Sequence, residues 1–164
     1  MTIQLIPCNT TAQLSQVQQL AHDIWHRHYP DIITLEQIEF MLGNNYSEPA
    51  LLKQQAEGQQ LFLIGEDEVQ PSGFLGVYRR AEGELFISKW YIRTELHGQG
   101  IGRSSFRLLC ELFSDTSCMR LQVNRQNFKA INFYFSLGFR IEHCADFDIG
   151  NGFYMNDFIM IWKP

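Results

Sequence analysis

Several features that mark particular protein classes are missing from this sequence. Its 164 residues carry 13 Lys and Arg against 18 Asp and Glu, for a net charge of −5, and the basic residues form short pairs such as Arg79-Arg80 rather than a stripe. Nucleic-acid-binding domains usually carry such a stripe, so we expect no nucleic-acid partner. A mildly acidic protein suits a small cationic substrate better than an anionic polymer.

Membrane spans, export signals and paired metal-binding cysteines are missing as well. No apolar run reaches the roughly 18 residues of a spanning helix, and the opening MTIQLIPCNT lacks the basic and apolar regions of a secretory signal. The four cysteines, Cys8, Cys110, Cys118 and Cys144, form no CxxC spacing, so we expect free and mostly buried thiols. These absences predict a cytoplasmic protein with no membrane partner and no metal.

The composition and hydrophobic pattern predict one α+β domain over residues 1–164. Apolar residues make up 45% and charged residues 19%, which is a globular balance. Periodicity and turn residues predict helices within 8–29, 34–42, 47–58, 101–114 and 127–138, and strands at 3–7, 60–66, 72–80, 83–92, 119–124, 139–149 and 152–162. Gly43 is expected to end the second helix. The tight turns make most strands antiparallel, so we expect a mixed sheet with helices on its faces.

A cluster of glycines, HGQGIG, stands between a predicted strand and a predicted helix. Gly98, Gly100 and Gly102 allow positive φ and close approach of a ligand to the backbone, and the helix N-terminus presents unpaired N–H groups. Together these features predict a phosphate site, to which Arg103 and Ser104 add donors. A Walker loop is excluded because no Lys follows, and a dinucleotide fingerprint needs glycine where Arg103 stands. A tight turn without a ligand is the alternative.

Two segments resemble motifs of the GCN5-related N-acetyltransferases (GNAT). LFISKWYIRTELHGQGIGRSSFRLL (85–109) looks like the acetyl-CoA signature, in which a strand, a short gap and a glycine loop lead into a helix; His97 departs from the usual Arg or Gln. LQVNRQNFKAINFYFSLGF (121–139) is similar to a second family motif. The N-terminal helices and the closing hairpin resemble a bacterial branch that includes polyamine-acetylating enzymes.

The resemblance implies a GNAT-like fold with a central, mixed, mostly antiparallel seven-stranded sheet flanked by helices. It also implies acetyl transfer from acetyl-CoA to the amine of a small molecule, polyamine-like or other, and a homodimer that pairs through the last strands. A noncatalytic module that binds or senses acyl-CoA is the alternative on the same fold. The residues assigned to the cofactor are Trp90, Tyr91, Ile92, His97, Gly98, Gln99, Gly100, Ile101, Gly102, Arg103, Ser104, Asn124, Asn127, Ala130 and Phe133.

The resemblance assigns the role of general acid to Tyr134. Its phenol, with a pKa near about 10, suits protonation of a leaving thiolate, whereas a packed core tyrosine is the alternative. A backbone N–H near Tyr91 or Ile92 would polarise the thioester carbonyl. No base is assigned: the glutamate that some relatives use falls on Phe86, and Glu84 is a weaker candidate that we expect to be a solvated strand-end carboxylate.

The acceptor side of the site is predicted on the N-terminal helices. The resemblance places Trp25, Tyr29 and Met41 at the wall of an amine pocket, where aromatic faces contact a cation; a helical aromatic stripe in the core is the alternative. Asp146, Asp148 and Asp157 on the last hairpin are expected to be solvated surface residues, although carboxylates there would attract an amine.

The remaining signals are a histidine pair, a lysine and two cysteines. His22 and His26 lie one helical turn apart, as zinc ligands do, but Asp23 replaces the glutamate of H-E-x-x-H; a metal hydrolase is the alternative from another class. Lys89 precedes Trp90 and has no derived role. Neither Cys110 nor Cys144 has an adjacent base in a motif, which favours direct transfer without an acyl-enzyme.

Overall fold

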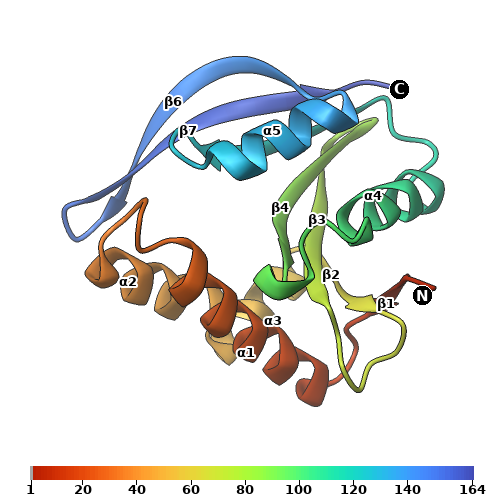
Figure 1. Cartoon of the computed structure of the whole chain (residues 1–164), viewed down its shortest axis with the longest axis horizontal. Helices are drawn as coiled ribbons and strands as arrows, with labels where there is room; N and C mark the ends of the chain where they lie inside the picture. Colours follow the sequence, from red (N-terminus) through yellow and green to blue (C-terminus); the bar gives the residue numbers. More distant parts are fainter. Residues whose placement is uncertain (1) are drawn as a thin grey trace. The chain divides into compact units, whose positions relative to one another are not determined.

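The computed structural model describes residues 2–164 and contains every helix and strand that the sequence predicts, together with one unpredicted 3₁₀ turn (Figure 1). The helices are α1 (Thr11–His28), α2 (Leu35–Tyr46), α3 (Glu48–Ala56), η1 (Thr94–Leu96), α4 (Ile101–Leu112) and α5 (Phe128–Leu137). The strands are β1 (Gln4–Pro7), β2 (Gln60–Gly65), β3 (Gly73–Ala81), β4 (Glu84–Ile92), β5 (Cys118–Asn124), β6 (Arg140–Gly150) and β7 (Phe153–Trp162).

The strands form one seven-stranded sheet in the order β1-β2-β3-β4-β5-β7-β6. β4 and β5 are parallel, because the chain between them returns through α4, whereas β1–β2, β2–β3, β5–β7 and β6–β7 are antiparallel. The parallel pairing joins Glu84–Ile87 to Cys118–Leu121, and β4 continues to Ile92. The predicted mixed, mostly antiparallel sheet with helices is therefore confirmed.

Local signals account for most of the helix ends. The Thr10 side chain accepts from the Gln13 backbone N–H and the Gln13 side chain accepts from the Thr10 backbone N–H, which completes a capping box at α1. The prediction that Gly43 ends the second helix is wrong, since α2 continues to Tyr46. Tyr46 is buried, and its packing outweighs the cost of about 1 kcal/mol for a helical glycine.

The chain forms two compact units. Unit 1 comprises residues 2–78 and 89–114, and unit 2 comprises residues 79–88 and 115–164, so that β3 and β4 contribute to both. In unit 1 the apolar faces of α1 to α3 pack with β2 and β3 around side chains such as Leu20, Ile38 and Phe74. In unit 2 the fully buried side chains include Met119, Phe139 and Met160.

Candidate functional site

The glycine loop of unit 1 has the backbone geometry of an anion cradle. Gly98 and Gly100 both have φ of +81°, and a Cβ built on either would meet no atom within 4 Å. Gly100 is the N-cap of α4 and has no side chain to satisfy the helix, whose first internal bond runs from the Ser104 N–H to the Gly100 carbonyl. The Ile101 and Gly102 amides therefore have no intrahelical acceptor, and the loop directly before them has open space at Gly98 and Gly100, which together fit a phosphate group.

The His97 side chain is turned toward the strand rather than extended along the loop. Its Nε2 lies 2.9 Å from the Ile92 carbonyl oxygen. A carbonyl can only accept, so Nε2 carries the proton and donates. The imidazole therefore joins the beginning of the loop to the end of β4.

A buried hydrogen-bond chain fastens β4 to α4. The indole N–H of Trp90 donates to Ser105 Oγ at 3.1 Å, and Ser105 Oγ–H donates to the Gly102 carbonyl at 2.8 Å. The Trp90 ring stacks on Phe106 with ring centres 5.9 Å apart. The Trp90 side chain therefore packs between β4 and α4, so a ligand would contact mainly the backbone of this residue. Ser105 was missed by sequence reasoning, although its position three residues after Gly102 on an apolar helix face was a signal.

The end of β4 is held closely by the start of β3. A Cβ at Gly73 would lie 2.1 Å from the Tyr91 carbonyl oxygen, so only glycine permits this approach. The Arg93 N–H donates to the Ser72 carbonyl at 2.8 Å. These contacts fix the backbone of Tyr91 and Ile92, the two residues predicted to present an N–H to the thioester.

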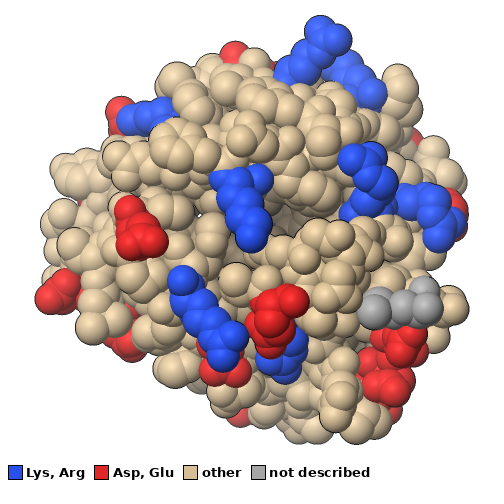
Figure 2. Space-filling model, in the orientation of Figure 1, with Lys and Arg blue, Asp and Glu red and all other residues tan. Residues whose placement is uncertain are grey.

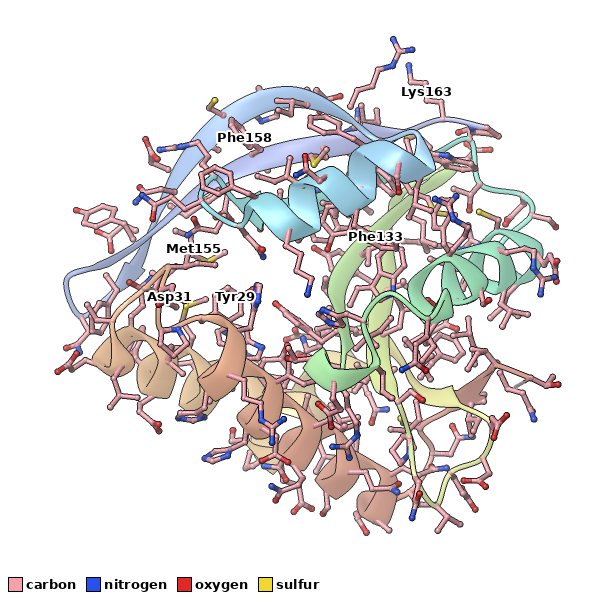
Figure 3. The ribbon with its side chains drawn as sticks, in the orientation of Figure 1. Tyr29, Asp31, Phe133, Met155, Phe158 and Lys163 are labelled. Carbon is pink, nitrogen blue, oxygen red and sulfur yellow. The ribbon has the colours of Figure 1, made fainter. Side chains whose placement is uncertain are left out.

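The aromatic residues of the N-terminal helices form a cluster in unit 1. Trp25 is buried, with its ring centre 4.5 Å from that of Tyr29, so Trp25 is a core residue. Tyr29, labelled in Figure 3, is half-buried and its hydroxyl lies 3.0 Å from the hydroxyl of Tyr91. Met41 is also half-buried and packs against this core. Tyr29 and Met41 therefore keep the exposed surface that an acceptor contact requires.

Lys89 is a buried cation next to this cluster. Its Nζ donates to Gln54 Oε1 at 2.7 Å and to Gln59 Oε1 at 3.2 Å, and it lies 5.2 Å from the ring centre of Tyr46. Burial lowers the pKa of Lys89 to about 8. Its contacts tie β4 to the end of α3.

In unit 2, the end of β5 leads directly into α5. The Asn127 N–H donates to the Asn124 carbonyl at 2.9 Å, and Asn127 Oδ1 caps α5 by accepting from the Ala130 N–H at 3.4 Å. The predicted cofactor residues Asn124, Asn127 and Ala130 thus first serve to start this helix. Phe133 (Figure 3) and Tyr134 follow on α5 and are both half-buried, so Tyr134 is not a fully enclosed core side chain.

Glu84 lies in an ion-pair network, and the expectation of a solvated carboxylate is wrong. Its Oε1 is 3.0 Å from Arg120 Nη1 and 3.8 Å from Arg80 Nε. Arg120 also donates to both carboxylate oxygens of Glu142, at 3.0 Å each. Glu84 is therefore committed to two guanidinium groups of unit 2, which opposes a role as base or amine ligand.

The structure shows hydrogen bonds at His26 and free thiols at the cysteines. His26 Nδ1 donates to the His22 carbonyl at 2.7 Å and Nε2 donates to Glu39; these bonds raise the pKa of His26 and occupy both ring nitrogens. Among residues 2–164, no three His, Cys, Asp or Glu side chains are grouped to hold a metal. All four cysteines are free, but Cys144 is exposed, which corrects the expectation of mostly buried thiols.

The charged side chains on the surface and the apolar content of the helices both bear on the kind of partner this protein has. Figure 2 shows Lys and Arg interspersed with Asp and Glu on the displayed face, without a continuous basic stripe. No helix within residues 2–164 is both long enough and apolar enough to cross a membrane.

Comparison with known proteins decides the family. The model of the acetyltransferase (GNAT) family matches residues 18–139, more than half of the chain, and this stretch contains the glycine loop and α5. The chain belongs to the GNAT family. It is therefore an N-acetyltransferase that uses acetyl-CoA. This assignment replaces the alternative of a metal hydrolase.

Individual relatives agree with this assignment. An uncharacterised N-acetyltransferase of Mycobacterium tuberculosis is 23% identical over 134 residues, covering 80% of this chain and 85% of the relative. The PaiA N-acetyltransferase of Thermoplasma acidophilum, solved with coenzyme A, has a TM-score of 0.81 at 23% identity over 100% of both chains. A chimera of Vibrio cholerae spermidine N-acetyltransferase SpeG and hSSAT has a TM-score of 0.67 at 17% identity, covering 99% of this chain and 96% of that one. At these identities the solved structures establish the fold.

Proposed function

We propose that this GNAT enzyme acetylates the amine of a small molecule, polyamine-like or other, by direct attack on acetyl-CoA with Tyr134 as general acid. The observation that carries the proposal is the glycine loop, where two left-handed glycines with open space around them directly precede the first amides of α4. The net charge of −5 favours a cationic acceptor. One similar fold belongs to an enzyme described as a spermidine N-acetyltransferase chimera.

The chain's own residues divide the work of this reaction. The Ile101 and Gly102 amides, with the Arg103 and Ser104 side chains, bind the diphosphate, and the Tyr91 or Ile92 N–H polarises the carbonyl. Bound acetyl-CoA supplies an activated thioester. Tyr134 donates its phenolic proton to the leaving sulfur, because phenol and thiol have pKa values within about two units of each other.

The rest of the predicted set has supporting roles in this proposal. Tyr29 and Met41 contact the acceptor, the former through its aromatic face. Phe133 and Ala130 on α5 border the acyl arm, and residues 1–164 act as a single domain. The enzyme pairs as a homodimer through its last strands. Sedimentation velocity tests whether it is a dimer.

A direct test combines cofactor binding with an acceptor screen. Calorimetry should detect coenzyme A binding to the purified protein, and free thiol should appear from acetyl-CoA in proportion to an added amine. Spermidine, butylamine and an alanine-initiated tripeptide are suitable probes. Cofactor binding without amine-dependent thiol release from any of them would favour the noncatalytic sensing module, whereas no heat of binding would overturn the proposal.

A further inference from the structure

Asp157 is a buried carboxylate in the middle of the sheet of unit 2, and the expectation of a solvated residue is wrong. It is 3% exposed. On β7 it lies between β5 and β6, opposite Asn124 on one side and Ala145 on the other. Acidic side chains are almost never buried to this degree unless a cation or several hydrogen-bond donors compensate the charge.

The nearest cation does not compensate it. Arg125 Nη1 donates to the backbone carbonyl of Asp157 at 3.2 Å, and Arg125 Nη2 donates to Asp146 Oδ1 at 2.8 Å. Within residues 2–164, no hydrogen bond or ion pair reaches the Asp157 carboxylate. The other two aspartates of the hairpin do have partners: Asp146 has Arg125, and Asp148 Oδ1 accepts from the Gly150 N–H at 2.9 Å.

The surroundings of this carboxylate bring its pKa close to neutral pH. Burial raises the pKa of Asp157 to about 6; the positive charge of Arg125 lowers it and the negative charge of Asp146 raises it. Arg125 directly follows β5 and Asp146 lies on β6. Of the other charged groups on these two strands, Arg120 donates to Glu142, and His143 Nδ1 lies 3.6 Å from Glu142 Oε1. A general base works best when its pKa lies near the operating pH.

The position of Asp157 connects it to the proposed reaction. Its neighbour across the sheet, Asn124, is the last residue of β5 and one of the predicted cofactor residues. The Asn124 carbonyl accepts from the N–H of Asn127, the cap of the helix that carries Tyr134. Asp157 therefore adjoins, within unit 2, the strand end and helix start that the mechanism uses.

We propose that Asp157 binds the ammonium group of the acceptor and removes its proton. The inference rests on the proposed function and supplies the base that the mechanism lacks. An ammonium is the partner that a buried, unpaired carboxylate requires, since the pair neutralises its charge. Binding and deprotonation by the same oxygen atoms would then deliver a neutral amine.

The step balances. The carboxylate takes one proton from R–NH₃⁺ and leaves R–NH₂. The amine nitrogen forms the bond to the acetyl carbon with displacement of the sulfur, Tyr134 protonates that sulfur, and the resulting phenolate takes the second nitrogen proton. Asp157 returns its proton to water, so the net products are the acetamide, the thiol and one proton.

The test compares Asp157→Asn, which keeps the shape and removes the charge, with Asp148→Asn, which removes the same charge elsewhere on the hairpin. For Asp157→Asn we expect kcat/KM with spermidine to fall at least about 100-fold at pH 8. The decline of wild-type kcat/KM below pH about 6 should disappear from the residual activity. Calorimetric binding of spermidine to the protein–coenzyme A complex should be lost, coenzyme A affinity should stay within about twofold, and Asp148→Asn should match the wild type.

The outcomes separate the inference from the proposed function. Asp157→Asn with activity within about threefold of wild type and the acidic decline intact would overturn the inference alone. A lowered melting temperature with parallel loss of coenzyme A binding would also overturn it, because it would indicate a structural role. A wild-type protein that binds no coenzyme A and acetylates none of the amine probes would contradict the proposed function, and this inference with it.

Discussion

At the scale of single residues, the buried polar side chains divide into satisfied and unsatisfied groups. Lys89, Ser105 and Asn127 each have hydrogen-bond partners that join two elements or cap a helix. Asp157 is equally buried, yet its carboxylate has no partner within residues 2–164. Stable proteins seldom leave such a group without compensation, which is the reason for proposing a ligand for it.

Tyr134→Phe tests the proposed acid. Phenylalanine keeps the ring contacts with Phe133 and Phe139, whose centres both lie 5.8 Å from the Tyr134 ring, but it has no proton to donate. We expect kcat to fall at least about tenfold, with coenzyme A affinity unchanged by calorimetry. Tyr154→Phe removes a hydroxyl from an exposed position and serves as control. Unchanged turnover in Tyr134→Phe would exclude the phenol from proton transfer.

Asp157 also predicts a pH dependence of stability. Its pKa rises from 3.8 in the unfolded chain to about 6 in the folded protein, so the folded state binds more protons between these values. Its contribution to the free energy of unfolding therefore falls as pH rises from about 4 to 6, by up to about 3 kcal/mol. Asp157→Asn should be more stable than wild type at pH 8 and nearly equal to it at pH 4 in urea titrations. An advantage of the same size at both pH values would contradict this origin.

At the scale of elements, hydrogen bonds on both sides anchor the glycine loop of unit 1. His97 joins the loop to the end of β4, and Trp90 and Ser105 join β4 to α4. Between these points Gly98 to Gly100 are exposed and free of side-chain contact at the glycines. A loop anchored in this way can bind an anion with little cost of ordering the backbone.

Gly100→Ala tests this cradle. Alanine at φ +81° is strained by about 1–2 kcal/mol, but its methyl group meets no protein atom, so the protein should fold. The methyl group would enter the space assigned to the diphosphate, and we expect the Kd for coenzyme A to rise at least about tenfold.

Gly58→Ala is the matched control for this substitution. Gly58 also has a left-handed backbone, with φ +102° and no atom near a Cβ, but it follows α3. It should lose similar stability while the Kd for coenzyme A stays at the wild-type value. An equal loss of affinity in both variants would remove the loop from cofactor binding.

At the scale of the whole molecule, β3 and β4 run through both compact units. Unfolding either unit would break the backbone hydrogen bonds of strands that the other unit shares, which favours one cooperative transition. We therefore propose that residues 1–164 form a single domain.

Tryptophan placement makes that cooperativity measurable. Trp25 and Trp90 belong to unit 1 and Trp162 belongs to unit 2. In Trp162→Phe, fluorescence reports on unit 1 alone, while circular dichroism reports on all helices. We expect coincident urea midpoints for the two signals, and saturating coenzyme A should raise both together. Separate midpoints would divide the chain into two domains.

Local chemistry in the sequence determined the elements, the glycine loop and the family motifs. Hydrophobic periodicity, helix caps and turn glycines each act over a few residues, so they can be recognised in the sequence alone. Tertiary structure decided what depends on distant partners. Burial of Tyr46 extends α2 past Gly43, Ser105 bonds an indole from another element, and Glu84 is paired with Arg120. Asp157 reads as a polar strand residue, and its side chain becomes buried only in the folded chain, because desolvation is a property of the assembled structure.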